Sequence, residues 1–442
     1  MGWVPIARRS RHDAEIVRLA VPAFGALIAE PLYVLADTAV VGHLGTEQLG
    51  GLAIASAVLL TAFAAFIFLA YGTTAAVARL LGAGREREAA EQAVQSLWLA
   101  LLIGVVVATA TYLVAPSLVG LLGAEGAVRT NAIIYLRVSL PGVPLQLLVF
   151  AGTGYLRGLQ DTRTPLFVAI GTATLNLVIE VILIVGLDYG IGASAAATVV
   201  AQLVAATVYV RLIVRAARVR GATIRPHGPS IARLAKVGGD LFIRTFALRA
   251  AITGSVALAA RVGVADLGAH QIAFEIWSFI ALGLDAIAIA GQALIGRYLG
   301  ADDAPTAREA GRRMLEWGVV AGVVAGLIVL VFRPLLPPIF SDDVEVLALA
   351  EFLLIWVAVL QPINGLVFVL DGLLIGAGDM RFLAWAMLGA LATMIPPAVA
   401  VIVFDLGIGY VWLAIGVLMV SRLLALGLRW RTDRWAITGA VR

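Results

Sequence analysis

Twelve long apolar stretches, separated by short polar breaks, dominate this sequence. They fall at about 15–43, 48–81, 90–122, 127–158, 163–187, 192–217, 231–262, 267–299, 306–340, 345–376, 381–405 and 409–431. A membrane-spanning helix needs roughly 20 mostly apolar residues, so each stretch is long enough to cross a bilayer once. The chain is 61% hydrophobic and 14% charged, whereas soluble domains are about 45–50% apolar and about 25% charged. We therefore expect an all-α integral membrane protein with twelve transmembrane helices.

The composition excludes several classes of site. None of the 442 residues is cysteine, which rules out thiolate metal ligands, thiol catalysis and disulfides. The four histidines have no paired spacing, and no phosphate-binding G-x-x-x-x-G-K-[ST] loop is present. We expect neither an enzyme, nor a cofactor, nor a zinc site.

Basic residues gather in alternate connections between the stretches. If the N-terminus is cytoplasmic, the inner connections hold Arg8, Arg9, Arg11, Arg85, Arg87, Arg157, Arg163, Arg308, Arg312, Arg313, Arg381 and the basic connection 211–236. The outer connections hold only Arg129, Arg261 and Arg333. Cytoplasmic loops of membrane proteins are rich in Lys and Arg. We therefore predict a multi-pass protein of the cytoplasmic (inner) membrane with both termini in the cytoplasm, and the net charge of +4 needs no nucleic-acid partner.

The two halves of the chain repeat. LRGLQDTRTP (156–165) matches LIGAGDMRFL (374–383) at an offset of about 218, and LDYGIGASAAA (187–197) matches FDLGIGYVWLA (404–414). Each half then has six helices, and an even number makes the repeats parallel, related by an axis along the membrane normal. We predict an N-terminal six-helix lobe (1–218) that carries a cation site and a C-terminal six-helix lobe (219–442). Two bundles around a central cleft favour a transporter that works by alternating access.

Three carboxylates of the first half lie at membrane depth, Glu30, Asp37 and Glu180. Such a group costs roughly 2.5–3.5 kcal/mol at a helix centre, so it is rare unless it faces a bundle interior or a watery cavity. Asn176 lies four residues before Glu180 and shares its helix face, and the next stretch offers Thr198. We predict that Asp37, Asn176, Glu180 and Thr198 form one cation-binding site.

The repeat provides an internal comparison for this site. At the repeat offset Asn176 falls on Met394, Glu180 falls on Ala398, and Asp37 falls on Ala260 through the match of LGTEQL (44–49) with LGAHQI (267–272). Polar groups that served only packing should more often recur in both halves. The predicted site is therefore confined to the first half.

The predicted ligands are all oxygen atoms or amide groups. They suit a proton or a hard cation such as Na⁺, and we expect H⁺, because a shared proton needs only the two carboxylates. Glu30 precedes Asp37 by seven residues on the same face, and Pro22 and Pro31 in this stretch remove backbone donors and can bend a helix. In the second half, Arg244, Arg249, Glu275, Asp285 and Asp371 are expected to pair internally, with Arg244 or Arg249 against Asp285.

Several motifs carry a family resemblance. PLYVLADTAVVGHLGTEQLGGLAIA, LDAIAIAGQALIGRYLG and YLRGLQDTRTP resemble the multidrug and toxic compound extrusion (MATE) family, DinF-like branch, over essentially all twelve stretches. The resemblance implies the MATE fold and antiport, in which H⁺ or Na⁺ enters while an organic, often cationic, compound leaves. It implies that Asp37, before Thr38, binds the cation with Asn176 and Thr198, although the second carboxylate of well-known prokaryotic members is Asp where this chain has Glu180.

The resemblance also implies further roles and leaves alternatives open. Pro22 matches a bending proline, and Glu30, Tyr33 and Tyr135 match substrate-cavity positions. The expected partners are a small-molecule substrate and membrane lipid, with no nucleic acid, and the expected functional form is a monomer. Some branch members export anions such as citrate or phenolic acids. A lipid-linked oligosaccharide flippase of the same superfold would call for cationic cavity side chains, and a non-transporting scaffold is a further alternative.

Overall fold

The computed structural model describes residues 10–440, and the described chain is helical with no strand. Its elements are α1 (Arg11–Gly42), α2 (Thr46–Phe66), α3 (Phe68–Gly82), α4 (Glu86–Leu121), α5 (Gly126–Ser139), α6 (Gly142–Gly158), α7 (Arg163–Val181), the π-helical turn η1 (Ile182–Gly186), α8 (Ile191–Val219), α9 (Gly228–Val262), α10 (Val264–Gly300), α11 (Ala304–Phe332), the 3₁₀ turn η2 (Pro337–Ile339), α12 (Val344–Gly376), α13 (Met380–Val403), α14 (Ile408–Arg431) and the 3₁₀ turn η3 (Asp433–Trp435).

Within the described chain, eleven helices are long and apolar enough to cross a membrane. α2 and α3 count as one of them, Thr46–Gly82. The pair α5 and α6 supplies the twelfth span if it is taken as one helix bent by 50°. Pro141 lies at this bend, and its missing N–H group removes a backbone hydrogen bond there. The predicted all-α membrane protein with twelve spans is confirmed.

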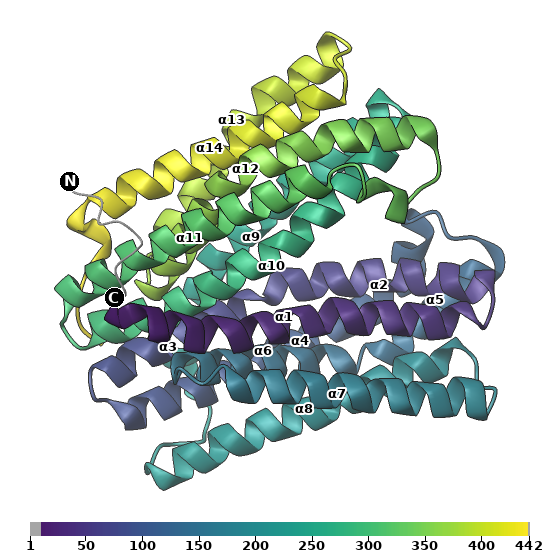
Figure 1. Cartoon of the computed structure of the whole chain (residues 1–442). Helices are drawn as coiled ribbons and strands as arrows, with labels where there is room; N and C mark the ends of the chain where they lie inside the picture. Colours follow the sequence, from purple (N-terminus) through teal and green to yellow (C-terminus); the bar gives the residue numbers. More distant parts are fainter. Residues whose placement is uncertain (1–9, 441–442) are drawn as a thin grey trace. The chain divides into compact units, whose positions relative to one another are not determined.

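The contacts between helices divide the chain into two compact units. The first-half unit is Gly25–Gly238, and the second-half unit comprises the chain up to Phe24 together with the chain from Gly239 onward. Figure 1 shows the helices of both units. The predicted lobes 1–218 and 219–442 follow the sequence repeat rather than these contacts, so their boundary stays a prediction.

Small residues let the helices of each unit pack closely. A Cβ added to Gly154 of α6 would lie 2.5 Å from the carbonyl oxygen of Ala70 in α3. In the second-half unit, a Cβ added to Gly376 of α12 would lie 2.6 Å from the carbonyl oxygen of Gln292 in α10. Small residues at such crossings are typical of membrane helices, which gain van der Waals contact by bringing their backbones together.

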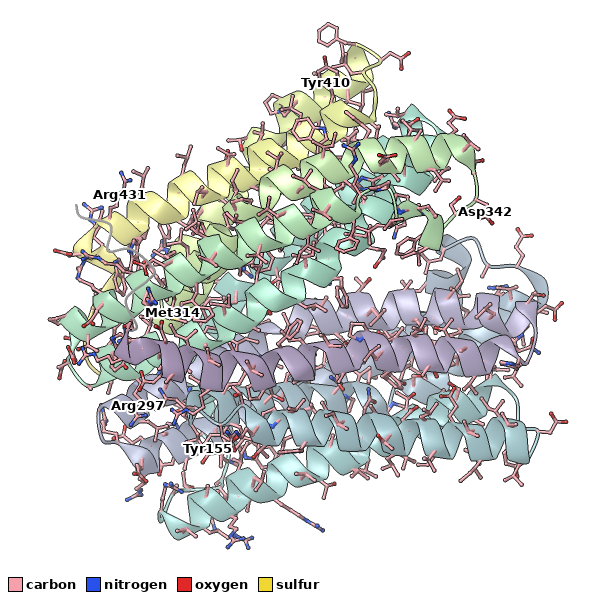
Figure 2. The ribbon with its side chains drawn as sticks, in the orientation of Figure 1. Tyr155, Arg297, Met314, Asp342, Tyr410 and Arg431 are labelled. Atoms are coloured by element: carbon pink, nitrogen blue, oxygen red, sulfur yellow. The ribbon has the colours of Figure 1, made fainter. Side chains whose placement is uncertain are left out.

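Charged residues lie at both ends of the second-half unit. Figure 2 shows Asp342 and Tyr410 at one end of this unit and Arg431 at the other. Near the C-terminal end of α12, Asp371 forms ion pairs with Arg244 of α9 and Arg422 of α14. Asp371 is thus a partner of Arg244 that the sequence did not reveal, and Arg422 adds a second guanidinium that sequence analysis did not single out.

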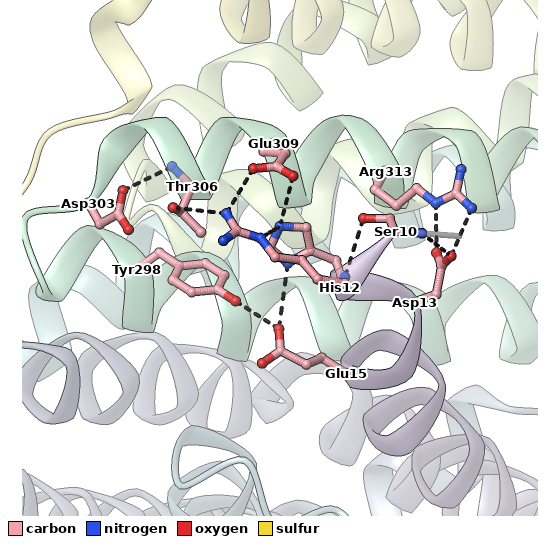
Figure 3. A network of polar contacts seen from close by, with 10 residues as sticks. Ser10, His12, Asp13, Glu15, Tyr298, Asp303, Thr306, Glu309 and Arg313 are labelled. Carbon is pink, nitrogen blue, oxygen red and sulfur yellow. Dashed lines mark hydrogen bonds and ion pairs between the residues drawn. The ribbon is translucent and has the colours of Figure 1, made fainter. Parts of the chain in front are cut away.

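A polar network attaches the start of α1 to α10 and α11 within the second-half unit (Figure 3). Arg313 donates to Asp13 from Nε and Nη2, at 2.6 and 2.9 Å, and the Trp317 indole N–H donates to the same carboxylate at 2.9 Å. The Tyr298 hydroxyl donates to Glu15 at 2.7 Å. These bonds fix the first turn of α1 to two neighbouring helices.

Candidate functional site

Three helices of the first-half unit each contribute two polar side chains spaced four residues apart. They are Tyr33 and Asp37 from α1, Asn176 and Glu180 from α7, and Ser194 and Thr198 from α8. The helical period places residues i and i+4 on one face, so each helix presents its pair in one direction. We call these six residues the Asp37 cluster.

Thr198 is the centre of one half of the cluster. Its Oγ1 lies 2.8 Å from the Tyr33 hydroxyl and accepts a hydrogen bond from Asn176 Nδ2 at 3.0 Å. It also donates to the backbone carbonyl of Ser194, at 3.2 Å. A hydroxyl offers one donor and two lone pairs. If Tyr33 donates, these three contacts use the full hydrogen-bonding capacity of Thr198.

The two carboxylates occupy the other half of the cluster. Ser194 Oγ donates to Asp37 Oδ1 at 2.8 Å, and Asp37 is 6% exposed. Glu180 is 0% exposed, and neither of its oxygens accepts a hydrogen bond within residues 10–440. Glu180 nevertheless lies close enough to Asp37 and Ser194 to interact with them electrostatically. Two buried acidic groups therefore lie within interaction distance of each other.

Unpartnered acceptors are the main chemical feature of the Asp37 cluster. In the described chain, both Glu180 oxygens and Oδ1 of Asn176 are buried without a donor. A buried acceptor left unsatisfied costs about 1–3 kcal/mol, and more if it is charged. A proton on a carboxyl group, or a small cation among these oxygens, supplies what they lack, so the residues fit the predicted binding of H⁺ or Na⁺. No cluster of three or more His, Cys, Asp or Glu suited to a metal occurs among the described residues.

Backbone irregularity adjoins the cluster on α7. The helix changes to the π-helical turn Ile182–Gly186 directly after Val181, one residue beyond Glu180. Such turns are rare and often occur at functional sites. Figure 1 shows α7 and α8 running beside each other, and the bond between Asn176 and Thr198 joins them.

The family profile described as MatE matches residues 22–182 and 251–400, which is more than half of the chain. The chain belongs to the MatE family. It is 32% identical to Protein DETOXIFICATION 44, chloroplastic, from Arabidopsis thaliana, over 93% of this chain and 81% of that protein. It is 27% identical to DNA damage-inducible protein F of Escherichia coli (strain K12), over 97% of this chain and 94% of that protein.

Solved structures show the same fold. A MATE structure in the bent conformation has a TM-score of 0.87 and 22% identity, covering 97% of this chain and 96% of that one. The Vibrio cholerae transporter VcmN in its bent form has a TM-score of 0.86 and 19% identity, covering 96% and 97%. This MatE protein is therefore a multi-pass membrane protein of a multidrug and toxic compound transporter family, and it is not an enzyme.

The MatE fold brings together most, but not all, of the predicted site residues. Asp37, Asn176, Glu180 and Thr198 lie in the cluster with Tyr33. Tyr135 of α5 is buried beside them, within reach of the Ser194 and Thr198 hydroxyls.

Two predicted residues are not members of the cluster. Glu30 is exposed, and no hydrogen bond or ion pair reaches it from the described residues. Pro22 lies in the part of α1 that belongs to the second-half unit.

Ser194 is the member of the cluster that sequence analysis missed. Its signal is present in GASAAAT, because Ser194 precedes Thr198 by four residues and shares its helix face. The sequence alone could not distinguish it from a hydroxyl that bonds back to its own helix, as Thr207 does with the carbonyl of Leu203.

Proposed function

We propose that this MatE transporter is a cation-coupled antiporter that exports organic compounds by alternating access. Asp37 and Glu180 are the coupling carboxylates in this proposal. One observation carries it: two buried acidic groups lie within interaction distance of each other, and one of them, Glu180, is fully buried without a hydrogen-bond donor among residues 10–440. A cation can drive a conformational change only if it binds one conformation more tightly than the other.

We propose H⁺ rather than Na⁺ as the coupling ion. A sodium ion needs several oxygen ligands at once. In the described arrangement, Thr198 Oγ1 already contacts Tyr33, Asn176 and the Ser194 carbonyl, so it has little capacity left for a metal. A proton needs only one carboxylate oxygen, and the unpartnered oxygens of Glu180 favour it.

The proposed substrates are organic compounds of cationic or amphipathic character. The acidic first-half cluster supports this class, because a flippase for a lipid-linked pyrophosphate would call for cationic side chains there. Export of small organic anions such as citrate or phenolic acids is the alternative substrate class. We propose a monomer surrounded by membrane lipid as the functional form.

The proposed location is the cytoplasmic membrane with both termini inside. The connections that carry most arginines support this orientation, although Arg8 and Arg9 lie outside the described residues. In the second-half unit, Arg431 lies at the end opposite Asp342, as this topology requires (Figure 2).

Transport in proteoliposomes tests the coupling proposal. Wild type and Asp37→Asn are compared for efflux of a cationic dye under an imposed pH gradient, and again under a Na⁺ gradient at equal pH. Coupled efflux should disappear in Asp37→Asn while the protein stays monodisperse in detergent. The matched control is Asp188→Asn, the same chemical change at an exposed residue between η1 and α8, which should transport normally. Normal efflux by Asp37→Asn contradicts the proposal.

A further inference from the structure

One side of α8 changes from apolar to basic towards its C-terminal end. The first twenty residues of the helix, 191–210, contain no charged side chain, and Arg211 follows them directly. Twenty helical residues are about 30 Å long, which is the thickness of the hydrocarbon core of a bilayer. A span that begins at Ile191 therefore reaches the layer of lipid headgroups at Arg211.

Two further arginines continue the same side of α8. Arg215 and Arg218 follow Arg211 by four and seven residues, a spacing that keeps all three on one side of the helix. All three are exposed. Earlier along the helix this side carries the exposed apolar residues Val200, Leu203 and Val204. Exposed apolar side chains of a spanning helix face lipid tails, so the arginines that continue their row face the headgroups of the same lipids.

The neighbouring helix α7 adds a fourth arginine at the same level. The short connection after η1 makes α7 and α8 antiparallel neighbours (Figure 1), and Asn176 bonds to Thr198 across them. Arg163 lies thirteen residues before Asn176, and Arg211 lies thirteen residues after Thr198. Equal helical lengths bring the two arginines to one level, and Arg163 is exposed as well. We call Arg163, Arg211, Arg215 and Arg218 the arginine face.

The acidic residues of the neighbouring helix ends are already engaged. Asp161 Oδ1 accepts hydrogen bonds from the backbone N–H groups of Arg163 and Thr164, at 3.1 and 3.0 Å, so it caps the start of α7. The three glutamates at the start of α4 pair with other arginines, Glu86 with Arg220, Glu88 with Arg85 and Glu91 with Arg87. Within residues 10–440, no ion pair neutralises a member of the arginine face. Its four positive charges are therefore available to an anion outside the protein.

We propose that the arginine face binds the phosphate of an anionic phospholipid whose acyl chains lie along the apolar side of α8. Guanidinium groups donate paired hydrogen bonds to phosphate oxygens, and basic residues beside a span attract anionic lipids. A phosphate without acyl chains would lack the contact with the exposed Val200, Leu203 and Val204. The inference names a lipid partner and its site, and it does not rest on the coupling proposal.

Native mass spectrometry of the purified full-length chain tests this proposal. Dioleoyl phosphatidylglycerol is the probe, and dioleoyl phosphatidylcholine, with the same acyl chains and no net charge, is the comparison lipid. Wild type should bind the anionic lipid roughly tenfold more tightly. Glycerol 1-phosphate, which presents the phosphate without acyl chains, should not displace the bound lipid at equal concentration.

Paired substitutions show whether this face carries the binding. Arg211→Gln with Arg215→Gln removes two charges and should weaken binding of phosphatidylglycerol roughly tenfold. The matched control is Arg225→Gln with Arg233→Gln, the same loss of charge at two exposed residues beyond α8, which should bind like wild type. Arg211→Lys with Arg215→Lys keeps the charge and should stay within about threefold of wild type.

A single substitution on α7 guards against misfolding of the double variant. Arg163→Gln should weaken binding of phosphatidylglycerol about threefold while the protein stays monodisperse in gel filtration. Unchanged binding in both Arg163→Gln and the Arg211/Arg215 glutamine variant would overturn the proposal. An equal loss in the Arg225/Arg233 control would overturn it too, because net charge rather than this face would then attract the lipid.

Two comparisons with other ligands would also overturn the proposal. They are phosphatidylcholine binding as tightly as phosphatidylglycerol, and glycerol 1-phosphate displacing the lipid at equal concentration, which would indicate a site for a free phosphate. Asp37→Asn should bind phosphatidylglycerol like wild type, because lipid binding is measured without transport. Failure of the coupling proposal would therefore leave this one standing, and the reverse also holds.

Discussion

The Ser194 hydroxyl donates a 2.8 Å hydrogen bond to Oδ1 of Asp37 and so joins α8 to α1 across 157 residues of sequence. Both side chains are buried, and the serine is 0% exposed. A hydrogen bond to a charged group contributes about 1.5–3 kcal/mol. The bond fixes the direction in which the Asp37 carboxylate points, so its other oxygen stays available to a proton or a cation in our proposal.

Replacing Ser194 tests this relationship. Ser194→Ala removes the donor and leaves the Asp37 oxygen unpaired, so coupled efflux should slow roughly tenfold. The measurement is the initial rate of dye efflux from proteoliposomes at a fixed pH gradient. Ser255→Ala is the control, because Ser255 is a buried hydroxyl of the second-half unit that bonds to the Ile252 carbonyl. An unchanged rate in Ser194→Ala would make this hydroxyl a packing residue only.

Neutral members of the cluster should distinguish the two coupling ions. Asn176→Ala and Thr198→Ala remove an amide and a hydroxyl that hydrogen-bond to each other at 3.0 Å. If the carboxylates alone bind the proton, the efflux rate of each variant under a pH gradient should fall only about threefold. A loss of this size is expected from one neutral hydrogen bond. Efflux driven by a Na⁺ gradient at clamped pH, and abolished by Thr198→Ala, would reverse the choice of ion.

The sequence predicted the spans well, because long apolar runs and charged breaks encode them directly. The break at Arg85 and the basic stretch before α9 both fall at helix ends in the structure. No comparable feature of the sequence indicated that α1 is divided between the two units. Its first turn pairs with Arg313, some 300 residues away, and periodicity within one helix does not report a distant ion pair.

The site was only partly predictable for a similar reason. Unusual carboxylates such as Asp37 and Glu180 stand out in an apolar stretch. Ser194 does not, since serine in a membrane helix usually bonds to its own backbone. Glu30 has the seven-residue spacing that places it on the same helix face as Asp37, and in the described structure it is exposed and makes no hydrogen bond to the cluster, so its role in a substrate cavity stays a prediction. The helical period shows in which direction a side chain points, but it does not show which residue of another helix lies in that direction.

The attachment of α1 should contribute to stability. Asp13→Ala removes one carboxylate that accepts two bonds from Arg313 and one from Trp317. Both side chains of the ion pair are largely shielded, at 21% and 12% exposed, so the loss should be about 2 kcal/mol. Thermal unfolding in detergent measures it. Arg11→Ala breaks an exposed pair with Glu309 in the same network and should change the midpoint little. Equal shifts for the two variants would contradict this account.

Pro22 tests whether α1 must bend during transport. The helix is continuous from Arg11 to Gly42, but Pro22 has no N–H group to donate to the carbonyl of Arg18. Pro22→Ala restores this donor and favours a straight helix. Turnover should fall while substrate affinity changes little, as measured by efflux rate and by binding on the same preparation. If turnover is unaffected, the proline is tolerated rather than required.

The last prediction concerns the asymmetry between the two repeats. Ala398→Glu copies Glu180 into the second half, and its side chain enters an apolar cavity between α9 and α13. The first-half carboxylate has Asp37, Ser194 and Asn176 nearby, whereas the repeat counterparts of Asp37 and Asn176 are Ala260 and Met394. A carboxylate at this position lacks a second acid and an amide beside it, so it cannot reproduce the arrangement around Glu180. The double variant Asp37→Asn with Ala398→Glu should therefore remain inactive in proteoliposome efflux, like Asp37→Asn alone. Recovery of efflux by the double variant would show that either repeat can host coupling.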